Sequence, residues 1–460
     1  MENYKEELLK FYEKYPEMIT HPITMDEPNQ KISIYSGDFI ISHKGGLISI
    51  NGDIYFDWFP SKKVVFKGKV INSQVDVMSL VDGISDSELI LNDLVFSKCQ
   101  VSSTTLGKGT FLEGYTIYDS VFGDKTIPIS SARFVIPNLK DFHGDPIKKT
   151  KSDVVQFTRS RLVFEYDDWK IIIDGLPNHS QLRDKLKEKG GYLIQYAGEI
   201  TRTNKQIYFN DLKSILTSFS CFLSFINGLR CATHFHQGMH NDILLWTDYT
   251  PHKADMYKSV YSWSVWDDPT GLNDLWKNFS TLWSNDNDKD FIDSAIHWYL
   301  EANKNAGYLE GSLIMIQVGL ELLYNWLIIE KKKLLIGKDA DSISASNKIR
   351  LLLSQIKLKT DLPGSLKALL QFIKDNDLDD GVEAFVQIRN ALVHAQEEKR
   401  KKLLAIDQQV KIDALELGLW YLELCILHVL NYKGVYQFRC SDRLLSGTNE
   451  LSVPWTNSDL

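Results

Sequence analysis

The chain changes its hydrophobic pattern once, from short alternating runs to long helical ones. Between Lys31 and Ile173, apolar and polar residues alternate over runs such as ISIYSGDFIIS and GLISINGDIYFDWF, which are separated by Gly, Asn, Asp and Pro. Successive side chains of a strand point to opposite faces, so this pattern predicts antiparallel strands in a sandwich or barrel-like array. The sequence therefore predicts an α+β multidomain protein with a β-rich N-terminal region.

A mixed segment follows these strands. The expected elements outside the β-type runs are helices at residues 1–18, Gln181–Gly190 and Asp211–Leu229, and strands at Tyr192–Thr201 and Gln206–Asn210. Asp267–Gly271 is a turn signal, and the polar stretch TLWSNDNDKD at Thr281–Asp290 predicts a joint between domains. We therefore expect a sensing or regulatory N-terminal region over residues 1–280, with a helical segment near 211–229.

Beyond this joint the pattern is helical almost throughout, because apolar residues recur at spacings of three and four. The expected helices are Phe291–Asn303, Tyr308–Lys332, Ser346–Lys357, Ser365–Asn376, Gly381–Ala395 and Leu403–Asn431. They predict an all-α bundle over residues 285–434, followed by a peripheral tail at residues 435–460.

The helix at Tyr308–Lys332 contains SLIMIQVGLELLYNWLII, which is apolar on nearly every side. Such a helix belongs at the centre of a bundle. Gln317, Glu321 and Asn325 follow one another at intervals of four, so they share one stripe of it. A buried Glu321 must find a cation or stay protonated. Alternatively, the three polar residues form a seam that faces a subunit partner.

The helix at Gly381–Ala395, GVEAFVQIRNALVHA, has a charged residue within its apolar stripe. That residue is Arg389, and burying it alone would be costly, so it must be paired or face a polar interface. Glu321 is the expected partner. Asn390 and His394 are four residues apart and share a face of the helix.

The segment Arg389-Asn390-Ala391-Leu392-Val393-His394 resembles the R-x(4–6)-H motif, with Asn after Arg, of the HEPN superfamily. These are small helical domains, many of them metal-independent ribonucleases that act as dimers. The likeness extends over about Asp288–Tyr432. The preceding part more loosely resembles the N-terminal region of ApeA-type anti-phage abortive-infection proteins, on patterns such as Phe222–Gly228 (FLSFING).

The bare pattern of an arginine and a histidine is weak on its own. Arg230 and His236 in LRCATHFH also match it. That copy has no Asn after the Arg and no helical bundle following it. The neighbouring helices therefore select the copy at Arg389.

Residue chemistry and the resemblance together predict cleavage of RNA by its own 2′-hydroxyl. His394 can act as base or acid, because an imidazole has a pKa near 6.5. Arg389 can bind the scissile phosphate through two N–H groups, and Asn390 can orient the imidazole or donate to a phosphate oxygen. The resemblance places Glu321 near the motif arginine, and it implies a two-fold dimer with two such sets around one cleft. The expected products are a 2′,3′-cyclic phosphate and a 5′-hydroxyl.

Composition limits the possible settings. The net charge of −8 does not favour a protein that coats nucleic acid. The five cysteines are scattered, as in a reduced cytoplasmic protein. The N-terminus lacks the layout of a signal peptide, and the polar residues at 317, 321 and 325 interrupt the longest apolar run, so we expect no membrane span. No feature demands a cofactor or a metal.

Two further groups are candidates for binding. His234, His236 and His240 have a spacing that suits zinc, with Asp242 nearby, although alternating histidines also fit one strand face. The aromatic residues between Trp246 and Trp266 could stack on bases or sugars, or could form core.

The sequence thus predicts a cytoplasmic, metal-independent endoribonuclease of the HEPN type that acts in anti-phage defence. Its expected partners are an RNA substrate, with tRNA as a natural example, a second copy of the chain, and a phage-derived trigger. The alternative is a non-catalytic HEPN-like dimerisation or ligand-binding module, with the N-terminal region as sensor. A third hypothesis is a carbohydrate-binding β-domain that uses the aromatic cluster.

Overall fold

The computed structural model describes residues 13–80, 87–107, 109–151, 154–393, 406–441 and 449–456. Contacts between residues divide the chain into two compact units. Unit 1 contains Met1–Ser220 and Cys231–Lys258, and unit 2 contains Cys221–Arg230 and Ser259–Leu460. The chain therefore enters unit 2, returns to unit 1, and then completes unit 2. Most of the helix predicted at residues 1–18 lies outside the described residues.

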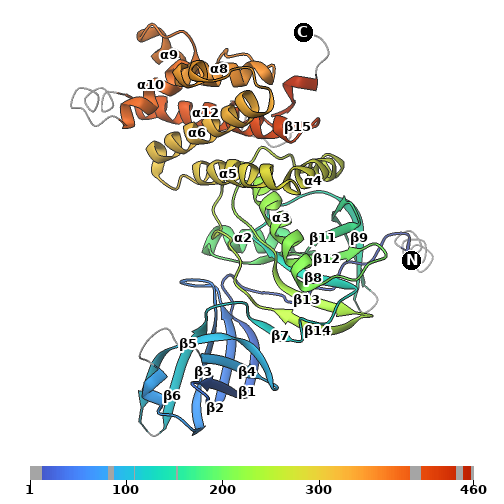
Figure 1. Cartoon of the computed structure of the whole chain (residues 1–460). Helices are drawn as coiled ribbons and strands as arrows, with labels where there is room; N and C mark the ends of the chain where they lie inside the picture. The colour runs from blue at the N-terminus through green and yellow to red at the C-terminus, as the bar shows by residue number, and fades with distance from the viewer. Residues whose placement is uncertain are drawn as a thin grey trace. The chain divides into compact units, whose positions relative to one another are not determined.

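Unit 1 begins with a closed antiparallel barrel (Figure 1). Its strands in spatial order are β1 (Ile32–His43), β2 (Gly46–Asp57), β3 (Lys63–Ser73), β6 (Thr110–Thr116), β5 (Leu94–Leu106) and β4 (Ser87–Leu91). Buried and outward residues alternate along β2, where Ile48 and Ile50 are fully buried. A Cβ on Gly52 would lie 2.1 Å from the Lys67 carbonyl oxygen, so only glycine allows this approach of β2 to β3. The alternating pattern correctly predicted antiparallel strands.

The rest of unit 1 is built on an antiparallel sheet of eight strands. In spatial order they are β7 (Val121–Gly123), β14 (Ile243–Asp248), β13 (His234–His240), β8 (Ser131–Pro137), β12 (Ile194–Arg202), β11 (Trp169–Gly175), β10 (Val154–Tyr166) and β9 (Asp145–Lys151). The other elements are η1 (Val77–Leu80), α2 (His179–Lys189) and the start of α3 (Phe209–Asn227). The strand predicted at Gln206–Asn210 is wrong. Ile207 forms one bridge with Ile129, and α3 has already begun at Phe209, with Asp211 in its first turn.

The barrel and the sheet share one hydrophobic core. The Phe56 and Phe235 rings meet edge to face with centroids 5.0 Å apart, and Trp58 stacks on Tyr192 at 5.3 Å. Because Phe235 belongs to β13, this strand is anchored in the middle of the core.

Unit 2 is mainly helical (Figure 1). It contains the end of α3, α4 (Pro269–Trp283), α5 (Asp286–Asn303), α6 (Tyr308–Tyr324), the π-helix η2 (Asn325–Lys331), α7 (Lys338–Ser342), α8 (Ala345–Gln355), α9 (Lys367–Asp375), α10 (Gly381–Val393), α12 (Gln408–Val429), β15 (Val435–Gln437), β16 (Glu450–Ser452) and η3 (Pro454–Thr456). α6 contacts α5, α8, α10 and α12, so its predicted central place is confirmed.

Within the described ranges, one helical segment, Tyr308–Lys331, is long and apolar enough to cross a membrane by length and composition alone, with a mean hydropathy of 1.6. Its side chains at Leu313, Ile316 and Leu320 are fully buried among the other helices. The core helix of a soluble protein meets the same two criteria, and the central position of α6 accounts for its composition.

The predicted joint at Thr281–Asp290 does not coincide with the division between the units. Those residues form the end of α4, a short break, and the start of α5, and the two helices contact each other. The residues interpreted as a turn, Asp267–Gly271, form the start of α4, a helix that the sequence analysis did not predict. Asp268 accepts a hydrogen bond of 2.9 Å from the Gly271 N–H, and Pro269 occupies the first turn, as at a capped helix N-terminus.

The prediction of a peripheral tail is wrong for its first residues. Tyr436 and Cys440 are buried, and the Arg439 guanidinium lies 2.6 Å from the Glu423 carboxylate. Glu423 lies on α12 and is fully buried, so it requires a cation, and the chain after α12 supplies one.

Candidate functional site

The helix that carries the predicted motif, α10, is fixed at its N-terminus by Asp380. The Asp380 carboxylate accepts the Glu383 N–H at 2.9 Å, while the Glu383 carboxylate accepts the Asp379 N–H at 2.9 Å. Arg350 of α8 donates to both oxygens of Asp380, at 2.8 and 2.9 Å. Burial alone would raise the pKa of Asp380, but these hydrogen bonds hold it below its usual value. The start of α10 is therefore a reciprocal cap with an ionic anchor.

One face of α10 packs into the bundle. Val382, Phe385 and Val386 of the predicted apolar stripe are buried, whereas Leu392 is half-buried and Val393 is exposed. Gly418 of α12 lies against the Phe385 ring and against Ile316 of α6, so three helices meet at this point. The backbone of α10 is thereby held against α6 and α12.

Arg389 lies one turn beyond Phe385 and is half-buried. Its Nη1 donates to the Asn390 side-chain oxygen at 3.1 Å, and its buried Nε has no hydrogen-bond partner within the described part of the chain. Among the described residues, no carboxylate forms an ion pair with it. A guanidinium has five N–H donors, and the described residues use one of those of Arg389.

The predicted pairing of Arg389 with Glu321 is wrong. The Glu321 carboxylate accepts a hydrogen bond of 2.9 Å from the amide of Gln317, one turn earlier on α6. The three polar residues of this stripe also differ in burial, since Gln317 is buried, Glu321 is half-buried and Asn325 is exposed. A half-buried carboxylate can be satisfied by a neighbouring amide and water, and Glu321 needs no cation.

Of the four predicted site residues, the structure brings together Arg389 and Asn390. The side-chain oxygen of Asn390 accepts from Arg389 and so orients the guanidinium. His394 follows the last residue of α10 and lies outside the described residues. Val393 is 44% exposed, so α10 reaches the surface of the bundle at the motif.

The second arginine–histidine match is divided between the two units. Arg230 belongs to unit 2 and forms an ion pair with Glu301 of α5, whereas His236 lies in β13 of unit 1. This copy of the pattern therefore forms no HEPN-like site.

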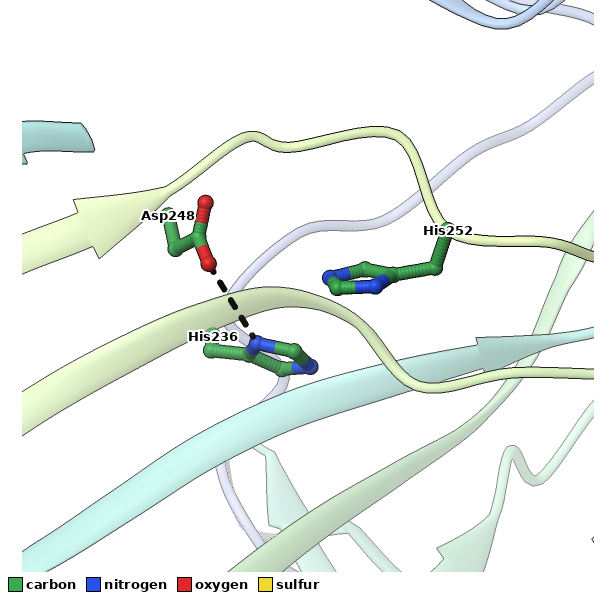
Figure 2. A group of neighbouring side chains, drawn as sticks. All are labelled: His236, Asp248 and His252. Carbon is green, nitrogen blue, oxygen red and sulfur yellow. Dashed lines mark ion pairs between the residues drawn. The ribbon is translucent and has the colours of Figure 1, made fainter. Parts of the chain in front are cut away.

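The candidate zinc set of His234, His236 and His240 is only partly a cluster. His236 instead groups with Asp248 and His252, and one ligand atom from each of these three lies within 4.8 Å of the others. Figure 2 shows Asp248 at the end of β14 beside His236 of β13, with the His252 ring reaching toward both from the following loop. His240 lies at the other end of β13.

The cluster is largely buried, and its charge state follows from that burial. Burial alone would raise the pKa of Asp248, but His236, Thr250 and His252 lower it to about 2. Burial is also the main reason that the pKa of His252 falls to about 3, with the charge of His236 adding to it. At neutral pH Asp248 is therefore a carboxylate and His252 a neutral imidazole, the forms that bind metal ions.

Asp248 and His252 were missed because their place depends on strand register. β13 and β14 are joined by Asn241 and Asp242, both with positive φ, as in a two-residue type I′ hairpin. A regular hairpin would pair His236 with Thr247. An irregularity after Gly238 shifts the register by one residue, so His236 lies opposite Asp248. The dipeptide Asn241–Asp242 could have indicated the hairpin from the sequence. No sequence pattern indicates the bulge after Gly238.

The aromatic cluster between Trp246 and Trp266 is mostly core. Trp246, Tyr249 and Trp263 are buried, while Trp266 is 40% exposed. Trp246 belongs to unit 1 and Trp263 to unit 2. The three buried rings therefore form core, as the alternative interpretation expected, and carbohydrate binding stays an untested hypothesis.

Comparison with known proteins identifies relatives without an assigned activity. Residues 124–260 match the YopA central domain, and residues 285–450 match the YopA C-terminal domain. The SPbeta prophage-derived uncharacterized protein YopA of Bacillus subtilis (strain 168) is 26% identical over 444 residues, covering 94% of this chain and 96% of that protein. No solved structure matches. The chain is thus similar to YopA along nearly its whole length.

Proposed function

We propose that unit 2 is a metal-independent endoribonuclease of the HEPN type. The observation that carries the proposal is the state of Arg389. It is half-buried on the motif helix, and among the described residues it has no carboxylate partner and its Nε makes no hydrogen bond. An arginine held this way by protein packing is suited to bind a phosphate through several N–H groups.

In this proposal each motif residue has a separate task. Arg389 binds the scissile phosphate and stabilises the charge that develops in the transition state. Asn390 orients the guanidinium through its side-chain oxygen, and its amide nitrogen remains available to a phosphate oxygen. His394 transfers the proton of the 2′-hydroxyl or of the leaving 5′-oxygen. Glu321 takes no part, because its carboxylate is bonded to Gln317.

A homodimer would complete the site. Val393 is exposed at the motif end of α10, and an apolar side chain there suits a surface that a second copy covers. Two motif helices around one two-fold axis supply two arginines and two histidines. The products would be a 2′,3′-cyclic phosphate and a 5′-hydroxyl.

The proposed setting is phage defence in the cytoplasm. The YopA relative is named as prophage-derived, and a ribonuclease encoded beside phage genes suits a role in conflict between phages and their host. Unit 1 would hold the nuclease inactive until a phage-derived trigger arrives, and cleavage of RNA such as tRNA would then stop translation.

The second candidate is a non-catalytic module that uses the same end of α10 for self-association. The exposed Val393 favours it, since this residue serves dimerisation whether or not RNA is cut.

The deciding experiment is RNA cleavage by the purified chain in EDTA, with analysis of the product ends. Arg389→Ala and His394→Ala should each lower the rate by at least ~100-fold. Gln387→Ala is the matched control, because Gln387 is an exposed residue of the same helix, and it should cut normally. Arg389→Lys should retain part of the activity, because it keeps the charge but loses the planar fork.

Equal cleavage by wild type and His394→Ala would exclude the proposed chemistry. If wild type dimerises but cuts no RNA, even with phage lysate present, the non-catalytic module is the better description.

A further inference from the structure

We propose that His236, Asp248 and His252 bind one divalent transition-metal ion of the zinc class within unit 1. This site is separate from the motif of α10 and does not depend on the ribonuclease proposal. The three residues come from β13, from the end of β14 and from the loop after it, so the fold rather than a local motif brings them together.

The distances leave a gap that suits an ion. His236 Nδ1 lies 3.8 Å from Asp248 Oδ2, which is too long for a hydrogen bond between two groups that are both buried. A metal ion at about 2.0–2.2 Å from each atom spans that separation with little movement. His252 lies within 4.8 Å of both and is attached to a loop, so it can close on the ion.

The outward-facing atoms of two ligands already have partners. His236 Nε2 lies 2.9 Å from Thr233 Oγ1, and the other Asp248 oxygen accepts the Thr250 N–H at 2.9 Å as well as the Thr250 hydroxyl. These contacts fix the imidazole and the carboxylate with Nδ1 and Oδ2 turned toward each other. Such a second set of hydrogen bonds is usual around metal ligands.

His252 supplies an independent observation. Its Nε2 is buried and makes no hydrogen bond to any residue that the structure describes. A buried imidazole nitrogen without a partner is costly, and a metal ion or a water bound to one would satisfy it. The ring centroids of His236 and His252 are 4.9 Å apart, so both imidazoles border the same space.

The backbone of β13 is adapted to this arrangement. Phe235 has a φ of +54°, a conformation that is uncommon for an aromatic residue, and the pairing of β13 with β8 shifts between His234 and Gln237. Strained residues and bulges cluster where a side chain must be aimed. Here the irregularity after Gly238 places His236 opposite Asp248, and Phe235 remains in the core.

The donor set indicates the class of ion. Two imidazoles and one carboxylate suit Zn²⁺ and neighbouring divalent ions, whereas Mg²⁺ and Ca²⁺ prefer oxygen ligands. Three protein ligands leave a fourth position for water or for an incoming group. Bound metal would also fix residues 249–252 to the β13–β14 hairpin, and should therefore raise the stability of unit 1.

The test is calorimetric titration of Zn²⁺ into the full chain after treatment with EDTA and removal of the chelator. Wild type should bind one equivalent, and its melting temperature should rise by roughly 5 °C at saturation. Asp248→Asn, which keeps the shape of the side chain, and His252→Ala should weaken binding by at least ~100-fold. Co²⁺ in place of Zn²⁺ should give visible d–d absorption that these variants lose.

Two further variants separate this site from adventitious binding to surface histidines. His240→Ala changes a histidine of the same strand outside the cluster, and it should bind zinc as wild type does. Thr233→Val should weaken binding by about 10-fold, because it removes the partner of His236 Nε2. No binding by wild type below about 100 µM, or equal binding by wild type, His252→Ala and Thr233→Val, would overturn the proposal.

Discussion

Two arginines of unit 2 show how the partner of a buried charge determines its use. Arg439 is 8% exposed and reaches two carboxylates, those of Glu423 and Glu416, at 2.6 and 3.0 Å. Arg389 is half-buried and is bonded to a neutral amide. The first charge is neutralised within the bundle, so it is structural. The second remains able to attract an anion, which is why Arg389 is the better candidate for chemistry.

Arg439→Met should destabilise unit 2 by about 3–5 kcal/mol, because the fully buried Glu423 loses its cation. Urea unfolding of the full chain, followed by the helical signal, measures this loss. Adding Glu423→Gln to the same chain should recover much of the stability, since the uncompensated charge disappears. A loss below about 1 kcal/mol in the single variant would contradict the ionic role of Arg439.

His428 should make unit 2 sensitive to acid. Burial, together with the charge of Lys332, lowers the pKa of His428 to about 4. Between pH 6.5 and 4 the unfolded chain therefore binds a proton that the folded chain does not, so stability falls as the pH falls through this window. From pH 7 to 4.5, wild type should lose about 1–2 kcal/mol more than His428→Gln. The free energy of unfolding of both chains is measured in urea across this pH range. If it depends on pH in the same way for both, His428 is not the cause of the acid sensitivity.

At the residue scale the sequence revealed which side chains are anomalous but not what they contact. Arg389 stood out as a charge on an apolar stripe, and the structure places it half-buried. The prediction that Glu321 is its partner was wrong. The four-residue spacing of polar residues along α6 shows that they share one stripe, but it does not show which neighbouring helix this stripe faces. The pair of Arg439 and Glu423 was missed for a related reason, since the two residues are brought together by the turn of the chain after α12.

At the scale of elements, periodicity predicted the strands and most helices well. The helix expected at Ser346–Lys357 is α8 at Ala345–Gln355, and the one expected at Ser365–Asn376 is α9 at Lys367–Asp375. The strand register could not be predicted from the sequence, because one bulge between β13 and β14 moves Asp248 from opposite Phe235 to opposite His236. The zinc-type cluster therefore depends on a feature that hydrophobic pattern does not encode.

The packing of α10 against α12 can be tested at its closest point. A Cβ on Gly418 would lie 2.7 Å from Phe385 Cε2 and 3.0 Å from Ile316 Cγ2, and both neighbours are fully buried. Gly418→Ala should therefore destabilise unit 2 by about 1–2 kcal/mol, even though alanine favours a helix.

Gly319 of α6 is the matched control for this prediction. Its added Cβ would lie 3.0 Å from one methyl group of Leu422, at the flexible end of that side chain. Gly319→Ala should therefore be neutral, or stabilising by up to about 1 kcal/mol. If both alanine variants stabilise the chain in urea, the contact of α10 with α12 at Gly418 is looser than described.

At the scale of the whole molecule, the path of the chain between the two units is the feature that sequence reasoning missed. Sequence reasoning predicted one domain boundary, because it relied on one polar stretch, Thr281–Asp290. In the structure, unit 2 begins with Cys221–Arg230. Residues 231–258, which belong to unit 1, separate this segment from the rest of unit 2 in the sequence. Within unit 2, Trp263 Nε1 donates to the Phe225 carbonyl at 3.1 Å, and the Asn303 amide donates to the Gly228 carbonyl at 2.8 Å. These bonds make the early segment part of the later fold.

A single cut in the connection after unit 1 should therefore leave the protein in one piece. A specific protease site inserted between Lys258 and Ser259, which are both exposed, would divide the chain into residues 1–258 and 259–460. The N-terminal fragment still carries residues 221–230, whose contacts lie in unit 2, so the two fragments should elute together in native size-exclusion chromatography and separate in urea. Fragments that separate without denaturant would mean that residues 221–230 are not held in unit 2, and that its core is complete without them.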